Sequence, residues 1–458
     1  MPAESEPSEV ALLSLAEACA LARAKKLSPV ELTKGCLARI EALNPELNAF
    51  IRVTSEMALA QARAAEAEIQ RGNWRGPLHG IPLAFKDLID VAGVPTTAAS
   101  KVFENRVPTE DAEVVRRLKA AGAVIVGKNN LHECAYGGSG LISCHGPSKN
   151  PRYPGRTTAG SSSGSAAAVA AGLCYGAIVT DTAGSIRVPA VFCGIVGFKP
   201  TYGLVSARGV MPLSWSLDHI GPMARSVTDV ALILAAIAGY DPADPTSRQI
   251  PIEDYAAVRV SVPKLRVGVP RKFFYEDLDP DVARVLEGAL KVVAGLAAEM
   301  REISISVDND RTVAKAETYA FHLPNLRDSA DKYDSETSRR INAGADVSVR
   351  DYVAKLHELE LARRSAAEIF KDVDVVVTPT APVPPPLVAE LQAEPSRLRE
   401  RELLMLRNTR PFNVLGLPAI SVQCGETSAG LPVGLQIAGP AGKDAQVLAF
   451  ARAFEQAR

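Results

Sequence analysis

Short apolar runs alternate with amphipathic patterns along most of the chain. Runs of about four to eight apolar residues predict buried strands, and apolar residues spaced by three and four predict helices. Predicted strands lie at 81–85, 123–126, 177–180, 265–269, 373–377, 419–422 and 431–438, the last two with the spacing of a hairpin. Predicted helices lie at 28–44, 55–69, 109–121, 166–171, 226–238, 279–298, 312–321, 351–370 and 443–457. This alternation predicts an α/β sheet with crossover helices.

The segments between these elements decide the expected domain organisation. Length alone, at 458 residues, suggests about three domains. However, strand and helix patterns continue in the same way before and after the loop at 240–263, with no internal repeat and no clean linker. We therefore expect one domain over residues 10–458 after a disordered polar tail at 1–9. Residues 216–222 predict turns, and residues 322–350 a polar, mobile segment.

The composition of the chain limits the kinds of molecule that we expect it to bind. The formal net charge of −1 argues against a nucleic-acid or anionic-membrane surface. We expect a small-molecule substrate, no nucleic acid, no membrane, and a monomer or homodimer. The seven cysteines are odd in number and never have CxxC spacing, so we expect free thiols in the cytoplasm and no zinc site. No metal or cofactor is implied.

The stretch from Gly160 to Pro200 is dense in serine and glycine. It predicts a helix opened by Ser161–Ser165 and then a short strand ending at Asp181, which the small residues 182–185 follow. A strand that ends in a tight turn of small residues presents backbone N–H groups and a hydroxyl to one side. An oxyanion hole needs this geometry.

Other motifs offer competing chemistry. GSSSG at 160–164 matches G-x-S-x-G, which would make Ser162 a nucleophile, but a loop precedes it where that motif needs a strand. Ser261–Lys264 matches S-x-x-K, although Pro263 disrupts the helix that this motif requires. His132 and Glu133 are adjacent, and we interpret them as capping or packing groups.

Lys86 ends the predicted strand at 81–85. A lone lysine in this place usually marks the exit of the strand into solvent. A lysine held beside serines and partly desolvated would instead be neutral near pH 7 and act as a base. The local sequence favours the first interpretation.

Six separated blocks, in order, carry a resemblance to a known family. They are GIPLAFKDLIDVAGVPTT (80–97), GSSSGSAAAVAAG (160–172), DTAGSIRVPAVFCGIVGFKPTYGLVS (181–206), SLDHIGPMARSVTD (216–229), VVVTPTAP (375–382) and GLPAISV (416–422). The pattern resembles the amidase signature family from about Ser28 to the C-terminal helix. The resemblance implies a single large α/β domain with a central twisted mixed β-sheet covered by helices on both faces.

The same resemblance implies a Ser-cisSer-Lys triad. Ser185 would be the nucleophile that accepts the acyl group, Ser161 the bridging serine on a cis peptide, and Lys86 the base. Chemistry agrees, because a serine hydroxyl is a poor nucleophile without an adjacent base, and a neutral lysine acting through a second hydroxyl can replace histidine.

The residues around the triad are expected to support it. By resemblance, the oxyanion would be held by the backbone N–H groups of Thr182, Ala183, Gly184 and Ser185. Asp181 and Arg187 would hold the turn by a charge-assisted pair, with Ser162 nearby. Family members usually carry paired glycines where this chain has Ala159-Gly160 and Ala183-Gly184. The Ala183 methyl group would strain any positive φ in the turn.

The substrate pocket is expected to be roomy and mainly apolar. The resemblance places Cys134, Ala135, Tyr136, Gly137 and Gly138 there, with the helical region near Tyr319–Leu323 and the proline-rich segment after Thr380. This favours an amidase that cleaves a small uncharged amide or carbamate (urethane), with esterase activity open.

One alternative is the glutamine-hydrolysing A subunit of a tRNA-dependent amidotransferase. HECAYG at 132–137 and the lack of an acidic residue at 408–413 argue against it. A degenerate scaffold without activity is a further alternative, which the three filled triad positions disfavour.

Overall fold

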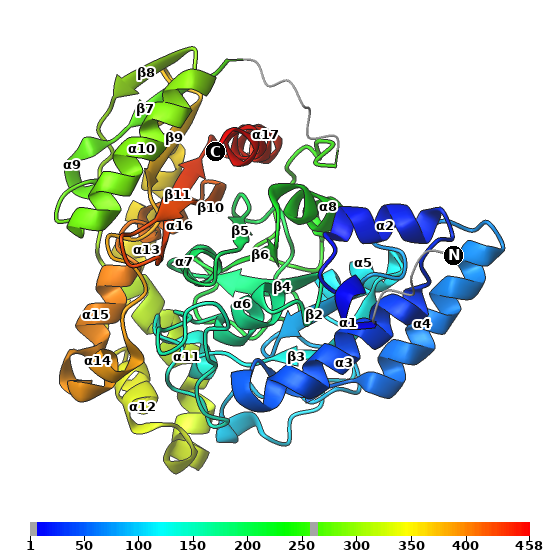
Figure 1. The fold of residues 1–458 in the computed structure, drawn as a ribbon. Coiled ribbons are helices and arrows are strands. Elements are labelled where there is room, and N and C mark those ends of the chain that lie inside the picture. The colour runs from blue at the N-terminus through cyan, green and yellow to red at the C-terminus, as the bar shows by residue number, and fades with distance from the viewer. Residues whose placement is uncertain (1–6, 257–263) are drawn as a thin grey trace.

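Eleven strands form one mixed β-sheet in the part of the chain that the structure describes, residues 7–256 and 264–458 of a computed structural model (Figure 1). In chain order they are β1 (Phe50–Val53), β2 (Pro82–Lys86), β3 (Val124–Asn129), β4 (Gly176–Asp181), β5 (Val196–Lys199), β6 (His219–Ala224), β7 (Arg266–Val269), β8 (Glu299–Glu302), β9 (Val375–Pro379), β10 (Ala419–Glu426) and β11 (Pro432–Ala438). The sheet order is β1-β3-β2-β4-β6-β5-β10-β11-β9-β7-β8. Each predicted strand coincides with one of these.

The helices surround this sheet. The α-helices are α1 (Pro7–Val10), α2 (Leu15–Arg23), α3 (Pro29–Leu47), α4 (Ser55–Gln70), α5 (Glu113–Ala120), α6 (Ser163–Ala170), α7 (Arg187–Phe192), α8 (Val227–Ile237), α9 (Arg271–Phe274), α10 (Pro280–Leu296), α11 (Thr312–Ser329), α12 (Ser335–Asn342), α13 (Val349–Ser365), α14 (Val388–Ala393), α15 (Leu398–Met405), α16 (Arg410–Val414) and α17 (Asp444–Ala457). Short 3-10 helices are η1 (Lys101–Phe103), η2 (Glu133–Ala135), η3 (Ala330–Lys332), η4 (Ala366–Phe370) and η5 (Pro395–Arg397).

Strand direction brings several strand ends together. β2 runs parallel to β3 on one side and to β4 on the other, with Phe85 opposite Ile178. The carboxyl ends of these three strands therefore meet at one edge of the sheet, where ligand sites of α/β folds commonly lie. From β4 to β9 the neighbouring strands are antiparallel, and they include the β10–β11 hairpin, which confirms the predicted pairing. At the far edge β7 is parallel to β9 and to β8.

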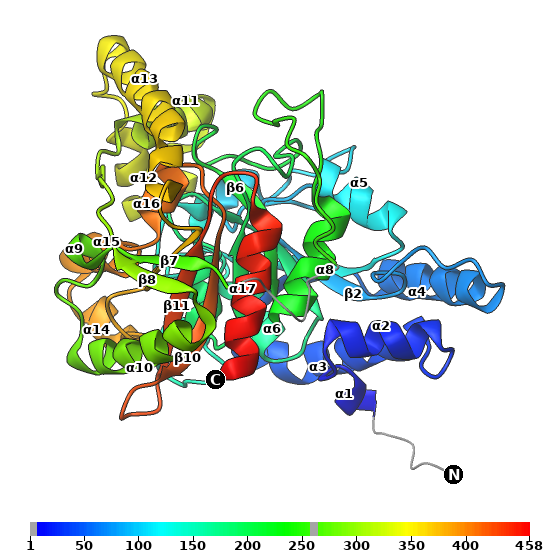
Figure 2. The same ribbon diagram turned by 90° about the horizontal axis from the view of Figure 1, so that it is seen from above.

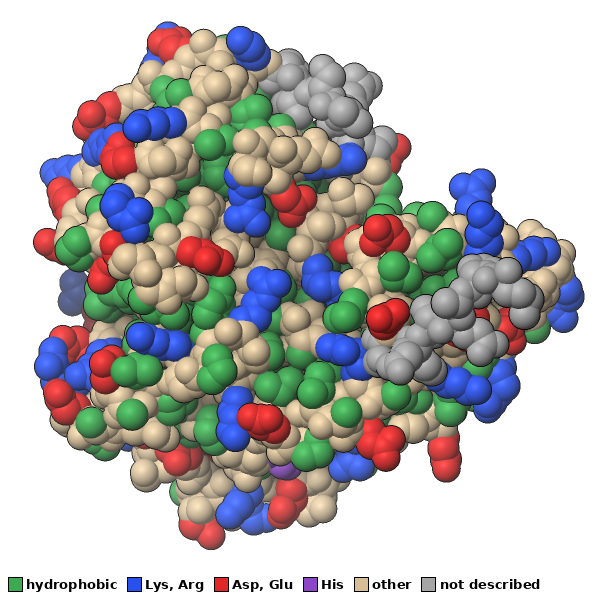
Figure 3. All heavy atoms as spheres, viewed as in Figure 1, with side chains coloured by type: hydrophobic (Ala, Val, Ile, Leu, Met, Phe, Trp, Pro, Cys, Tyr) green, Lys and Arg blue, Asp and Glu red, His purple; other side chains and the backbone are tan. Residues whose placement is uncertain are grey.

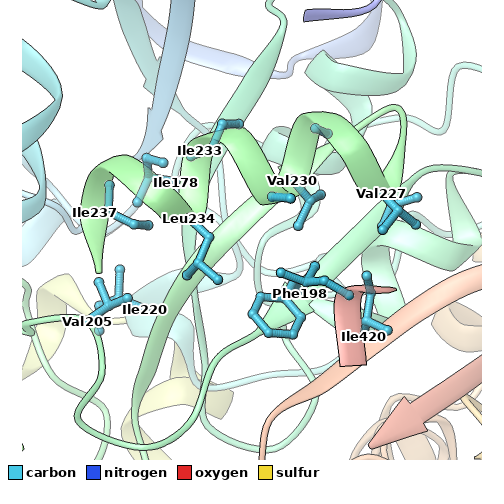
Figure 4. Packing of buried hydrophobic residues seen from close by; sticks show 14 of the residues in the cluster. Ile178, Phe198, Val205, Ile220, Val227, Val230, Ile233, Leu234, Ile237 and Ile420 are labelled. Atoms are coloured by element: carbon cyan, nitrogen blue, oxygen red, sulfur yellow. The ribbon is translucent and has the colours of Figure 1, made fainter. Parts of the chain in front are cut away.

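Both faces of the sheet are covered by apolar packing. Successive side chains of a strand point to opposite faces, and along β4 Ile178 belongs to one core cluster while Ala177 and Val179 belong to another. Val230 and Ile233 of α8 pack on the Ile178 side (Figure 4), and α6 packs on the other. α17 lies beside α8 (Figure 2). The expected fold, a single domain with a mixed sheet covered on both faces, is confirmed.

The prediction of turns at 216–222 is wrong from His219 onward. Residues 219–224 form β6, which pairs with β4 along its whole length and with β5 at Met223 and Ala224. Gly221 and Pro222 suggest a turn in isolation, but strand partners on both sides override this local signal.

The prediction of a mobile segment at 322–350 is also wrong. α11 continues to Ser329 and α12 follows it. Asp334 caps α12 by accepting from the backbone N–H of Glu336, and Arg340 of α12 is buried against the domain. Tertiary contacts thus order a segment whose own composition is polar.

Parts of two sequence interpretations lie outside the described residues. Of the expected disordered tail at 1–9, residues 1–6 are not described, while α1 begins at Pro7. The S-x-x-K match at 261–264 falls almost wholly within residues 257–263, which are not described. Among the helices that are described, none is both long and apolar enough to cross a membrane.

Candidate active site

Lys86 lies at the carboxyl end of β2 with a fully buried side chain. Its Nζ donates to Ser161 Oγ at 2.7 Å and to Thr180 Oγ1 at 2.8 Å. The interpretation of Lys86 as a solvent-exposed strand end is therefore wrong. β4 supplies Thr180 from the neighbouring parallel strand, so the sheet itself fixes the direction of the amine.

The environment of Lys86 favours its neutral form. Burial lowers the pKa of the amine to about 7, although the nearby Asp218 and Asp181 carboxylates act in the opposite direction. A neutral amine at this position can accept a proton from the hydroxyl to which it is hydrogen-bonded.

Ser161 lies in a tightly held loop before α6. The Gly160–Ser161 peptide is cis, as the resemblance implies. The loop is anchored because Gly160 N–H donates to the Gly138 carbonyl at 2.7 Å and the Ser161 carbonyl accepts from His132 N–H at 2.9 Å. Ala159 has a φ of 56°, a left-handed conformation that glycine adopts more easily. Ser162 Oγ donates to the Thr180 carbonyl at 3.4 Å.

Ser185 lies in the turn that follows β4, at the same sheet edge as Lys86, and lines a cavity together with Thr182 and Ala183. The residue with positive φ in this turn is Gly184, at 136°, so the strain expected at Ala183 does not arise. Gly184 N–H donates to Asp181 Oδ1 at 2.7 Å. It is therefore directed into the protein, which leaves Thr182, Ala183 and Ser185 as candidate oxyanion donors.

Asp181 and Arg187 form a fully buried ion pair, with Nη2 and Oδ1 2.9 Å apart. Burial alone would raise the pKa of the Asp181 carboxyl, but the guanidinium outweighs it and holds that pKa well below its usual range. Arg187 also donates to Asn413 Oδ1 and Gln436 Oε1, each at 2.6 Å. The turn that carries Ser185 is thus tied to α16 and β11.

The cavity above Ser185 has an empty volume of about 520 Å³, part of it open to solvent. Ala135, Tyr136 and Gly137 line it as expected, whereas Cys134 and Gly138 do not. The start of α11, through Ala314, replaces the expected 319–323 region, and the proline-rich residues 383–386 line a different hollow.

Three arginines, Arg311, Arg399 and Arg410, also line the cavity. The apolar lining that we expected is thus accompanied by three positive charges that we did not expect. No sequence signal identified them, because Arg311 is distant in the chain from the other two and all three lie outside the family blocks.

His132 and Glu133 lie beside the cavity residues but face the interior. Glu133 accepts from Ser100 Oγ at 2.7 Å and from Asp334 N–H at 3.0 Å, so it joins α12 to the loop. Burial lowers the pKa of His132 to about 3. Within the described residues, no group of three or more histidine, cysteine, aspartate or glutamate side chains could hold a metal ion.

Comparisons with known proteins add evidence about the family to this description of the site. The Amidase family model matches residues 31–448. The A subunit of glutamyl-tRNA(Gln) amidotransferase from Geobacter metallireducens is 41% identical, with 94% of each chain covered. Among solved structures, the corresponding A subunit from Thermotoga maritima has a TM-score of 0.79 at 33% identity, covering 98% of this chain and 95% of that one. A 6-aminohexanoate cyclic dimer hydrolase has a TM-score of 0.89 at 30% identity, covering 98% and 97%.

These relatives correct two expectations. The expected function, a hydrolase of small uncharged amides or carbamates, is wrong, because the full-length relatives at 39–41% identity are amidotransferase A subunits. The expected assembly, a monomer or homodimer without nucleic acid, is also wrong, because those relatives are subunits of an enzyme that acts on tRNA. The family itself follows from a match over nearly the whole chain: this protein belongs to the Amidase family, the amidase signature enzymes, and is an amide-cleaving enzyme.

Proposed function

We propose that the chain is the glutamine-hydrolysing A subunit of a tRNA-dependent amidotransferase, with Lys86, Ser161 and Ser185 as its catalytic residues. The observation that carries the proposal is the buried hydrogen bond from Lys86 Nζ to Ser161 Oγ, at the strand edge where Ser185 lines a cavity. The full-length similarity to amidotransferase A subunits supports glutamine as the amide donor.

The first half-reaction forms an acyl-enzyme. Lys86 accepts the proton of Ser161 while Ser161 accepts that of Ser185, and Ser185 Oγ attacks the side-chain amide carbon of glutamine. The backbone N–H groups of the turn bind the resulting oxyanion, each contributing about 3 kcal/mol of transition-state stabilisation. When the C–N bond breaks, the proton returns through Ser161 to the nitrogen, and ammonia leaves.

The second half-reaction restores the enzyme. Water attacks the ester on Ser185, its proton passes along the same relay, and glutamate is released. In an amidotransferase the ammonia is then used to amidate glutamate held on tRNA, once a nucleoside triphosphate such as ATP has activated the side-chain carboxylate and phosphate can leave with its oxygen. We infer that partner subunits hold the tRNA, since the net charge of −1 gives this chain little attraction for nucleic acid. The cytoplasmic location stays a prediction.

The test uses the assembly that forms around the chain in its own host. A tagged copy is purified with its bound partners and supplied with glutamine, glutamyl-tRNA(Gln), ATP and Mg²⁺. We expect release of glutamate and formation of glutaminyl-tRNA(Gln). An assembly that hydrolyses glutamine but never amidates tRNA contradicts the subunit role, and one that does neither contradicts glutamine as donor.

Matched serine variants test the catalytic assignment. Ser185→Ala is expected to lower kcat for glutamine hydrolysis by about 10⁴-fold or more. Ser163→Ala is the control, because Ser163 Oγ is buried, lies in the same serine cluster and has no hydrogen-bond partner among the described residues. Equal turnover by Ser185→Ala and Ser163→Ala would show that Ser185 is not the nucleophile, and a wild-type protein without turnover would identify a degenerate scaffold.

A further inference from the structure

Three arginine side chains from three separate segments meet at the cavity of Ser185. Arg311 immediately precedes α11, Arg399 lies in α15, and Arg410 begins α16. All three line the cavity together with Ser185 and Thr182. The fold thus assembles a cationic group beside the nucleophile from positions almost a hundred residues apart.

The protein itself neutralises only part of this charge. Arg410 is buried and donates to the backbone carbonyls of Asp308 and Asp310, and the nearby carboxylates of these two residues partly offset its charge. Arg399 lies 3.3 Å from Glu402, but that carboxylate is already paired with Arg340 at 2.7 Å. Arg311 has no side-chain hydrogen bond or ion pair with any of the described residues.

The positive charges of the three guanidinium groups repel one another when no ligand is bound. Burial, together with the charges of Arg410 and Arg399, lowers the pKa of Arg311 to about 9, so its guanidinium remains charged at neutral pH. An anionic group placed among the three side chains would relieve this repulsion. A guanidinium offers two parallel N–H donors that match the two oxygens of a carboxylate.

An ammonium group finds no matching partner here. None of the described residues that line this cavity is acidic. Asp218, which lies beside the Ser185 turn, accepts from Thr182 Oγ1 and from the backbone of Leu213, and lines a separate hollow. A cation near the three arginines would therefore add to the repulsion.

We propose that this arginine cluster selects the amide donor by its carboxylate and gains nothing from an α-ammonium group. The preferred substrates are then ω-amides of dicarboxylic acids, with glutaramate as the simplest member and glutamine accepted through its carboxylate. This inference rests on the proposed function for the hydrolysis of a primary amide by Ser185. Arg311 is assigned as a specificity-determining residue, since it is the cluster member without a structural partner.

The experiment compares three primary amides of similar length on the purified protein with its partners: glutaramate, glutamine and butyramide. Glutaramate is expected to have a kcat/KM at least equal to that of glutamine. Its kcat/KM should be about 10- to 100-fold above that of butyramide, because one charge-assisted hydrogen bond to the carboxylate contributes a factor of this size. Arg311→Gln should remove that advantage, mainly by raising KM, while butyramide hydrolysis stays within about twofold. Arg284→Gln, at an exposed arginine of α10, is the control.

Binding gives a readout that does not need turnover. Glutarate, the product dicarboxylate, should bind the wild-type protein about 10- to 100-fold more tightly than the Arg311→Gln variant in calorimetry. The inference is overturned if kcat/KM for glutamine exceeds that for glutaramate by tenfold or more, or if Arg311→Gln slows hydrolysis of all three amides equally. It is also overturned if Arg311→Gln leaves the Kd of glutarate unchanged. Hydrolysis of glutamine in any of these cases leaves the proposed function standing, whereas failure to hydrolyse any primary amide rejects both.

Discussion

At the scale of single residues, burial gives Lys86 properties that an exposed lysine lacks. Its amine is surrounded by β2, β4 and the loop that carries Ser161, and the two groups to which it donates are neutral hydroxyls. A cation surrounded by neutral groups in a dry site loses its hydration without full compensation. The pKa near 7 therefore follows from burial of the amine, which no directly bonded carboxylate offsets.

This environment predicts a specific pH dependence of glutamine hydrolysis. Because the neutral amine is the base and its pKa is about 7, kcat/KM should rise as pH increases through 7 and level off above 8. The pH profile of initial ammonia release measures this limb. Lys86→Arg keeps a cation at all accessible pH values, so we expect a loss of about 10²–10⁴-fold at every pH. A wild-type profile that is flat between pH 6 and 8 would rule out Lys86 as the titrating base.

At the scale of elements, the turn between β4 and α7 presents Ser185. Its geometry depends on Gly184, whose φ of 136° is available to glycine and strained for other residues. A Cβ there would also overlap Thr409 Oγ1, which donates to the Ala183 carbonyl at 2.7 Å. The turn and the residues before α16 therefore fit together with no space for a side chain.

Gly184→Ala is expected to lower both stability and activity. Backbone strain alone should cost about 1–3 kcal/mol of unfolding free energy, measured by urea denaturation. Displacement of Ser185 by about 1 Å should reduce kcat about a hundredfold.

Gly288→Ala, on the exposed face of α10 with open space around its Cβ, is the matched control. It should stabilise the protein by about 0.5–1 kcal/mol. Equal effects of the two substitutions would show that the Gly184 turn is not strained.

At the scale of the whole molecule, Arg187 joins segments that are far apart in the chain. Its guanidinium contacts Asp181 at the end of β4, Asn413 in α16 and Gln436 in β11. The sheet edge that carries the candidate triad is thereby fixed to the C-terminal third of the domain. On the surface, charges of both signs are interspersed over the face seen in Figure 3.

Arg187→Met should destabilise the protein by about 3–5 kcal/mol, because it leaves the buried Asp181 carboxylate without its partner. Chemical denaturation followed by tryptophan fluorescence and circular dichroism measures this loss. Arg284→Ala breaks an exposed pair with Asp281 and should change stability by less than about 1 kcal/mol. Similar values for both variants would show that the buried network adds no more than a surface pair.

Much of the fold was predictable because its signals are local. The apolar runs that became β2, β4 and β9 are buried on both faces and bounded by polar residues, and the Ser28 capping box marks the start of α3. β6 was missed because its stability comes from pairing on both sides, which local sequence does not encode.

For the site, the sequence by itself determined the family and predicted the three triad positions, since glycine and serine blocks of this kind stand in continuous segments. Only the tertiary structure decided that Lys86 is buried, that Gly184 N–H is already bonded, and that arginines line the pocket. These properties depend on residues brought together from distant parts of the chain. Burial and charge balance are sums over such neighbours, so they exist only once the sheet and its covering helices have folded.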